Sequence, residues 1–148
     1  MSTHDELPLE ITPKVRDTCL CLHVQRAARA VARRYDEALR PLSLTNGQFS
    51  LMMSLNRAEA PRIGQVSAVL AMDRTTLTAN LKPLLRRGLV EMRVDEADRR
   101  SRRLMLTPAG RALLAAALPL WEEAQAANRE RVAGSDLAGL LADLRALS

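Results

Sequence analysis

The stretch Asp98-Arg99-Arg100-Ser101-Arg102-Arg103-Leu104-Met105-Leu106-Thr107 decides the fold of this chain. Its four arginines stand near the tip of a predicted two-stranded hairpin, with strands over residues 89–94 and 102–106 and a polar loop over residues 95–101. Guanidinium groups displace counterions from phosphates and reach into narrow grooves. A cationic hairpin next to an amphipathic helix therefore indicates a nucleic-acid partner.

The composition agrees with a polyanionic partner. The 148 residues suffice for one compact unit or two small ones, and the net charge of +5 with a pI of about 10.2 favours nucleic acid. Twenty of the 22 basic residues are arginines, which is also typical of a GC-rich genome. Genome composition explains the total, but it does not explain why eight arginines fall within residues 86–111.

The sequence shows no targeting or membrane segment. Residues 1–14 carry acids and prolines where a signal peptide needs an apolar run, and no apolar run approaches the roughly 20 residues of a membrane span. Cys19 and Cys21 are too few for a disulfide framework. We therefore expect a cytoplasmic protein with no membrane partner, in a reducing compartment.

Helical periodicity dominates the first part of the chain. After a flexible tail over residues 1–13, a long amphipathic helix is predicted from residue 14 to residue 40, where Pro41 ends it. Thr45 and Gln48 then form a capping box that starts the next helix, and Pro61 marks the following break.

A helix predicted over residues 73–87 has two chemically different sides. Its apolar side is formed by Leu77, Leu81, Leu84 and Leu85, and its other side by Thr75, Ala79, Lys82 and Arg86. Small, hydroxylated and basic side chains permit close approach to base edges and phosphates, so this helix suits a major groove. An ordinary solvated face is the alternative interpretation. Pro83 lies inside the helix and predicts a kink.

Further helices are predicted before and after this helix and the hairpin. A short helix over residues 63–71 precedes the helix over residues 73–87, which we name the groove-reading helix. Gly88 follows the groove-reading helix at the C′ position. Thr107 and Pro108 start a helix that runs towards residue 131, and Ser135 caps a last helix. No repeat or flexible linker interrupts this order.

Several short motifs carry a resemblance to a known family. They are Leu44-Thr45-Asn46-Gly47-Gln48-Phe49, Ile63-Gly64-Gln65-Val66, Asp73-Arg74-Thr75-Thr76-Leu77-Thr78, Leu85-Arg86-Arg87-Gly88-Leu89-Val90, Asp98-x-Arg100 and Leu106-Thr107-Pro108-Ala109-Gly110-Arg111. Each motif alone is weak, but their order and spacing are specific. Nearly the whole chain after residue 14 resembles the MarR (multiple-antibiotic-resistance regulator) family of winged helix-turn-helix transcription factors.

The resemblance implies a mainly α-helical fold with a small β-wing. A winged helix-turn-helix region over residues 43–107 would be flanked by dimerisation helices over residues 14–42 and 108–148. The groove-reading helix would enter the major groove and a wing arginine the minor groove, with Asp98 and Arg100 as a bracing pair. The implied DNA-binding residues are Arg74, Thr75, Thr76, Thr78, Asn80, Lys82, Asp98, Arg99, Arg100 and Arg102.

The resemblance also implies a homodimer that binds double-stranded DNA at a pseudopalindromic operator, most commonly as a repressor. The long apolar stripes of the first and last helices support a dimer independently, because a partner surface is one way to cover them. The two half-sites should lie one helical turn apart, about 34 to 36 Å.

The resemblance further implies a site for a small aromatic or anionic ligand between the dimer helices and the winged region. Its expected lining residues are His23, Arg26, Phe49, Met52 and Met53. Met and Phe at helical spacing also suit a plain core, which is the alternative interpretation for these positions.

A thiol-based peroxide or electrophile sensor is the alternative switch. Cys21 and Tyr35 are placed like the reactive cysteine and one tyrosine of the hydroperoxide-sensing members of the family, whereas Gln25 and Asn46 stand at that subgroup's other tyrosine positions. Because Cys21 and Tyr35 lie about 21 Å apart along one straight helix, a contact between them needs the dimer mate. A cysteine that acts as a small buried hydrophobe is the other interpretation.

Other functional classes fit less well. Cys19, Cys21 and His23 diverge on a helix and do not converge on one ion, so we expect no metal and no cofactor. The sequence has no nucleophile elbow, phosphate loop or histidine-rich motif, so we do not expect an enzyme. A dimeric interaction module with merely solubilising arginines is a second alternative, which a duplex from the protein's own promoter region would separate from a regulator.

Overall fold

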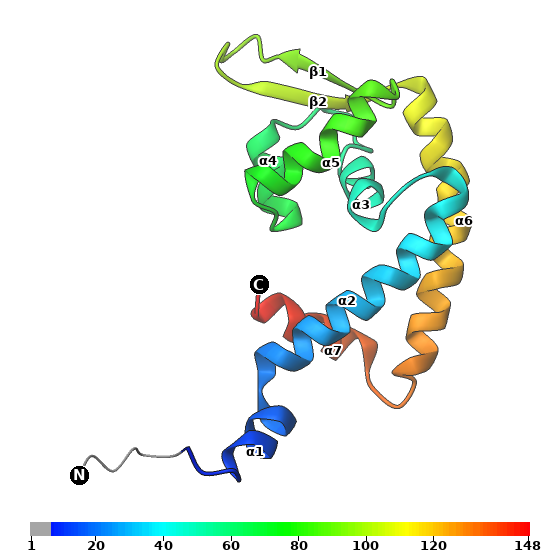
Figure 1. Cartoon of the computed structure of the whole chain (residues 1–148). Helices are drawn as coiled ribbons and strands as arrows, with labels where there is room; N and C mark the ends of the chain where they lie inside the picture. Colours follow the sequence, from blue (N-terminus) through cyan, green and yellow to red (C-terminus); the bar gives the residue numbers. More distant parts are fainter. Residues whose placement is uncertain (1–6) are drawn as a thin grey trace, which may run out of the picture. The chain divides into compact units, whose positions relative to one another are not determined.

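The computed structural model describes residues 7–148 (Figure 1). Residues 1–6 of the tail expected over residues 1–13 lie outside this description. The described residues divide into two compact units, residues 7–33 and residues 34–148. The elements in chain order are α1 (Ile11–Thr18), α2 (Leu20–Leu39), the 3₁₀ helix η1 (Arg40–Leu42), α3 (Asn46–Ser54), α4 (Ile63–Leu70), α5 (Arg74–Arg86), β1 (Val90–Val94), β2 (Arg102–Leu106), α6 (Pro108–Arg131) and α7 (Leu137–Ala146).

The first unit contains α1 and most of α2, and it corrects the single helix expected from residue 14. Helix α1 already begins at Ile11, with Pro13 in its first turn, where a missing amide removes no intrahelical hydrogen bond. Cys19 then adopts an extended backbone conformation, with ψ at 111°, and separates α1 from α2. Among the apolar side chains of this unit, Val15 and Leu20 are exposed.

In the second unit, local signals end α2 and start α3 as the sequence predicts. Helix α2 ends at Leu39, and Pro41 lies in η1. Thr45 Oγ1 accepts a hydrogen bond from the Gln48 amide at 3.2 Å, and Gln48 Oε1 accepts one from the Thr45 amide at 3.1 Å. This reciprocal capping box confirms the predicted start of α3.

Helices α4 and α5 form the helix-turn-helix. Between them, Ala71 has a positive φ of 48° and ends α4 in the left-handed conformation. Asp73 caps α5, because its Oδ1 accepts a hydrogen bond from the Thr76 amide at 2.7 Å. Helix α5 continues through Pro83 to Arg86. The predicted apolar side is buried at Leu77, Leu81 and Leu84.

The predicted hairpin is present and antiparallel. Val90 lies opposite Leu106 at its inner end, and Val94 lies opposite Arg102 at its outer end. Gly88 leads from α5 into the hairpin with φ at 69°, a left-handed conformation that glycine adopts readily after a helix. Strand β1 packs against α5, and the hairpin forms a projecting wing (Figure 1).

Thr107 fixes the start of α6 against the hairpin, as predicted. Its Oγ1 accepts a hydrogen bond from the Gly110 amide at 3.0 Å and donates one to the Gly88 carbonyl at 2.6 Å. A Cβ atom at Gly110 would lie 2.0 Å from the carbonyl oxygen of Leu89. Only glycine permits this close approach of α6 to the start of the wing.

Helix α7 is capped by Asp136, which corrects the cap expected at Ser135. The Asp136 carboxylate accepts hydrogen bonds from the amides of Ala138 and Gly139 at 3.1 and 3.2 Å. A carboxylate satisfies two free amides at once and interacts favourably with the positive end of the helix dipole.

One apolar core lies in the second unit, where α3 packs against α4, α5 and α6. Its largest fully buried side chains are Leu39, Leu51, Met52, Leu77, Leu84, Leu104 and Val66. The mainly α-helical fold with a small β-wing is therefore confirmed. Within residues 7–148, no helix combines the length and the hydropathy needed to cross a bilayer.

Candidate nucleic-acid interface

The side of α5 that faces away from the core carries most of the predicted groove contacts. The exposed members are Arg74, Thr75, Thr76, Thr78 and Lys82. Asp73 anchors the start of this surface, and its pKa lies below the ordinary value chiefly because the Thr76 amide donates a hydrogen bond to it. The helix thus presents hydroxyl groups and two cations on a rigid element, which is the chemistry that base edges and phosphates require.

Asn80 has a different environment from the other predicted contacts. Its half-buried side chain donates a hydrogen bond from Nδ2 to the Thr76 carbonyl at 3.0 Å. A Cβ atom at Gly47 would lie 2.9 Å from Asn80 Oδ1, so this amide fills the contact between α5 and the start of α3. The structure thus gives Asn80 a packing contact between two helices, and its groove contact stays a prediction.

The wing turn presents exposed arginines between its two strands. Arg99, Arg100 and Arg102 are exposed. Arg102 donates hydrogen bonds to the carbonyls of Arg99 and Ser101 at 3.1 and 3.3 Å, which folds its side chain back on the turn. The guanidinium groups of Arg99 and Arg100 form no salt bridge within residues 7–148. They are the cations of the wing tip that are available to phosphates.

The bracing pair expected between Asp98 and Arg100 is not formed by their side chains. Asp98 Oδ1 accepts a hydrogen bond from the Arg100 backbone amide at 3.1 Å, and Oδ2 accepts one from Ser101 Oγ at 3.2 Å. A short carboxylate at the start of a tight turn reaches the nearby amides more readily than the end of an arginine side chain. Asp98 therefore caps the turn and leaves the Arg100 side chain free.

A different carboxylate braces the wing. Asp95 Oδ2 lies 2.7 Å from Arg62 Nε, and Asp95 Oδ1 lies 3.3 Å from Arg103 Nε. The Ala97 amide also donates a hydrogen bond to Oδ1, at 3.2 Å. Burial alone would raise the pKa of the Asp95 carboxyl, but the Ala97 amide and the two guanidinium groups outweigh it and hold the pKa below its ordinary value.

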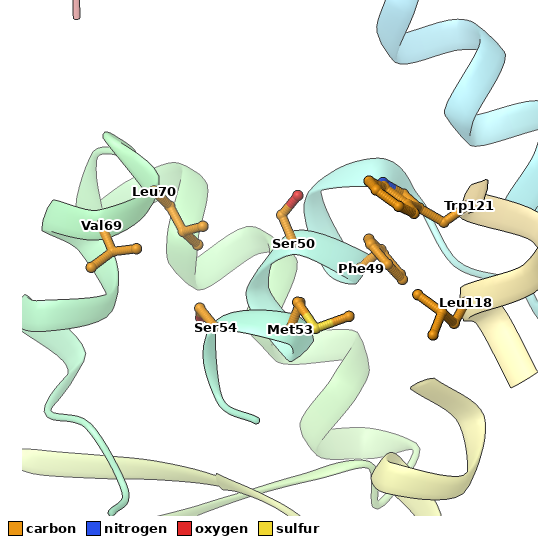
Figure 2. A pocket seen from close by; sticks show the side chains of 8 residues that line it. All are labelled: Phe49, Ser50, Met53, Ser54, Val69, Leu70, Leu118 and Trp121. Atoms are coloured by element: carbon orange, nitrogen blue, oxygen red, sulfur yellow. The ribbon is translucent and has the colours of Figure 1, made fainter. Parts of the chain in front are cut away.

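An apolar pocket of about 540 Å³ lies beside the winged core. Figure 2 shows α3 between Val69 and Leu70 of α4 on one side and Leu118 and Trp121 of α6 on the other. Its complete lining is Phe49, Ser50, Met53, Ser54, Val69, Leu70, Leu118 and Trp121. The lining contains two serine hydroxyls and no basic side chain, so it suits an apolar ring better than an anion.

Two of the five residues expected to line a ligand site line this pocket, and three do not. Phe49 and Met53 line the pocket, whereas Met52 is fully buried in the core. His23 and Arg26 belong to the first unit and do not line it. Trp121, which the sequence interpretation missed, stacks on Phe49 with ring centroids 6.2 Å apart. Its signal in the sequence was its position as the single tryptophan, on a long helix expected to pair with another chain.

The two residues predicted to act in a redox sensor, Cys21 and Tyr35, each have a hydrogen-bond partner of their own. Cys21 is exposed, and its Sγ accepts a hydrogen bond from Gln25 Nε2 at 3.3 Å. Cys19 is half-buried at the break between α1 and α2. The Tyr35 hydroxyl already donates a hydrogen bond to Gln125 Oε1 of α6. Within the described part of the chain, no three side chains of the metal-binding types are grouped closely enough to hold an ion.

Comparison with known proteins finds a DNA-binding family model and relatives that are transcriptional regulators. Residues 44–110 match the family described as a winged helix DNA-binding domain. The transcriptional regulator HosA of Escherichia coli O111:H- is 35% identical over 95 residues, which are 63% of this chain and 69% of that protein.

Solved structures share the fold over most of the chain. The Mycobacterium tuberculosis transcriptional regulator MosR in complex with DNA is 38% identical, with a TM-score of 0.78 over 87% of this chain and 92% of that chain. The transcriptional repressor CouR bound to a 23-mer DNA duplex is 28% identical, with a TM-score of 0.79 over 90% and 94%. Wild-type MarR from Escherichia coli is 26% identical, with a TM-score of 0.65 over 86% and 93%.

Proposed function

Because this chain belongs to the MarR family of winged-helix DNA-binding transcriptional regulators, we propose that it acts as a homodimeric repressor of a pseudopalindromic operator. In this proposal α5 of each protomer enters a major groove and each wing inserts an arginine into the neighbouring minor groove. The observation that carries the proposal is the pairing of two exposed cationic elements on one core, α5 with Arg74 and Lys82 and the wing with Arg99 and Arg100.

Exposed apolar side chains on the terminal helices support the dimer. Neither α1 nor α7 has a buried residue, and α2 has only Leu39. The exposed apolar residues of these helices are Ile11, Val15, Leu20, Leu22, Val24, Val31, Leu141 and Leu144. Burying such a set against a second copy removes apolar surface from water on both protomers at once.

The apolar pocket supports release by a small aromatic ligand. It is lined by α3 and α4, and α4 leads directly into α5. A ring inserted between Phe49 and Leu70 would bias the position of the helix that precedes α5, so occupancy and DNA binding would be coupled. We expect the aromatic character of the ligand to matter more than its charge, because the lining has no cation.

The test of the DNA contact uses duplexes from the protein's own promoter region. We expect nanomolar binding that weakens roughly a thousandfold between 50 and 200 mM salt. Arg100→Ala should lower the affinity about tenfold and reduce the slope of log affinity against log salt by about one. Arg129→Ala, which removes an exposed arginine at the far end of α6, is the control and should do neither. Equal affinity of the wild type and Arg100→Ala would contradict the wing contact.

Cys21 gives the second candidate switch, because its exposed thiol is accessible to peroxides and electrophiles.

Both switches are tested on the protein–duplex complex by adding benzamide, benzoate or cumene hydroperoxide. Release by benzamide that Ser50→Phe abolishes supports the pocket, and Trp121, the single tryptophan, reports binding by its fluorescence. Release by the peroxide that Cys21→Ser abolishes and Cys19→Ser retains supports the thiol sensor. Peroxide release that is unchanged in Cys21→Ser removes it.

A further inference from the structure

Asp95 is the buried charged residue of the described chain, with 3% of its surface exposed. It directly follows β1 at the outer end of the wing, in a turn whose other residues from Glu96 to Arg100 are exposed. An isolated carboxylate is costly to bury, and it is tolerated when it is paired and hydrogen-bonded. Asp95 meets this condition through Arg62, Arg103 and the Ala97 amide.

Apolar packing does not hold the outer half of the wing. Val90 is the only buried residue of β1, whereas Met92 and Val94 are 39% and 50% exposed. A two-stranded hairpin is marginally stable by itself in water. The outer half therefore needs another contact with the rest of the domain.

The Asp95 cluster lies where the wing meets the segment before α4. Arg103 Nη1 donates a hydrogen bond to the Ala60 carbonyl at 2.5 Å, and the Leu104 amide donates one to the Pro61 carbonyl at 3.0 Å. Arg62 is the residue that precedes α4. Through its two ion pairs, Asp95 thus connects the turn of the wing, strand β2 and the start of α4.

We propose that Asp95 is the positioning residue of the wing: its ion pairs with Arg62 and Arg103 hold the tip arginines, Arg99 and Arg100, at the distance from α5 that one stretch of duplex requires. Asp95 itself touches no DNA. The inference rests on the proposed entry of the wing into the minor groove. It assigns Arg62 and Arg103 a structural use, although their charge alone suggests phosphate contacts.

Electrostatics and positioning predict opposite effects when the charge of Asp95 is removed. A carboxylate near a phosphate backbone opposes binding, so its loss alone would strengthen binding to every duplex. Loss of a positioning contact weakens binding to the specific duplex only, because a loose wing still supplies positive charge to any duplex. The sign of the change on specific DNA therefore decides between the two.

The experiment compares Asp95→Asn with Glu96→Gln, which removes the neighbouring exposed carboxylate and serves as the matched control. The probes are a duplex that the wild-type protein selects from a random-sequence library and a scrambled duplex of equal length. We expect Asp95→Asn to lose about tenfold or more in affinity for the selected duplex and nothing for the scrambled one. Glu96→Gln should keep or slightly strengthen both. If the wild type selects no duplex, the proposed function fails, and not the role of Asp95.

Hydrogen exchange shows whether the wing has loosened in a folded domain. In Asp95→Asn the backbone amides of residues 95 and 101 in the turn should exchange faster, while the amides of α3 keep their protection.

If Asp95→Asn does not fold, Arg62→Gln tests the same contact, at a side chain that is 42% exposed. This variant should also lose affinity for the selected duplex. The double variant should lose no more than the larger single loss, because both act through one pair. Unchanged selectivity in Asp95→Asn, or in Arg62→Gln where that variant replaces it, overturns the proposal.

Discussion

The winged region and the terminal helices of this chain differ in how their apolar side chains are covered. From Leu39 at the end of α2 to Ala117 of α6, apolar residues of α3, α4, α5 and both strands join them in one buried core. Helices α1 and α7 have no buried residue, although both carry large apolar side chains such as Val15 and Leu144. The comparison teaches that the winged region buries its own apolar side chains, which favours its folding, whereas the terminal helices leave theirs exposed within the described residues.

The largest effect should come from a substitution that leaves a cavity in the buried core of the winged region. Leu51→Ala removes a fully buried side chain from α3 and should lower the free energy of unfolding by about 2 to 5 kcal/mol. Leu141→Ala, at a position 43% exposed on α7, is the matched control and should change the unfolding of the winged region by less than about 0.5 kcal/mol. Urea unfolding followed by circular dichroism measures both. Similar losses for the two variants would contradict the difference between the regions.

A smaller effect should come from charging the uncovered region. Replacing Leu141 and Leu144 by arginine places two cations on an apolar face that we expect to be buried in the dimer. The dissociation constant of the dimer should rise about a hundredfold or more, equivalent to about 2.7 kcal/mol. Sedimentation over a range of concentrations measures it, and the α3 amides of the same full-length variant should keep their protection from hydrogen exchange. A wild-type protein that sediments as a monomer at every concentration would remove the dimer from the proposed function.

The sequence predicted those parts of the molecule that local chemistry determines. The capping box at Thr45, the cap at Thr107 and the glycine at position 88 each act within a few residues, and all three are present. The two strands and the buried side of α5 also follow from short-range periodicity. These signals were sufficient for the fold class and for the division of α5 into a buried and an exposed side.

The remaining features depend on contacts between residues far apart in the sequence. Asp95 and Arg62 are 33 positions apart, and nothing in the sequence indicates that they pair. Asn80 lies on the predicted groove side of the helix, and only the structure shows that its side chain also packs against Gly47. The break at Cys19 lies in a segment of continuous helical periodicity, so no local signal marks it. Tertiary context decided each of these features.

The smallest effect concerns the wing alone and depends on pH. The pKa of the Asp95 carboxyl is lower in the folded protein than its ordinary value of 3.8, because the Ala97 amide and the guanidinium groups of Arg103 and Arg62 outweigh the effect of burial. A depressed carboxyl pKa stabilises the folded state fully above the ordinary value, and this contribution is lost as the pH falls below 3.8 through the lower folded pKa.

Amide exchange measured at pH 5, 3 and 2 should therefore show the wing turn losing protection before the buried side of α3 does, because that side consists of Phe49, Leu51 and Met52. Asp95→Asn provides the comparison, because its turn carries no titrating group at this position and should exchange rapidly at every pH. The wild type should approach the variant only at the acid end of the range. If the turn and α3 lose protection together in the wild type, the wing opens only with the whole domain, and the ion pairs of Asp95 do not hold it separately.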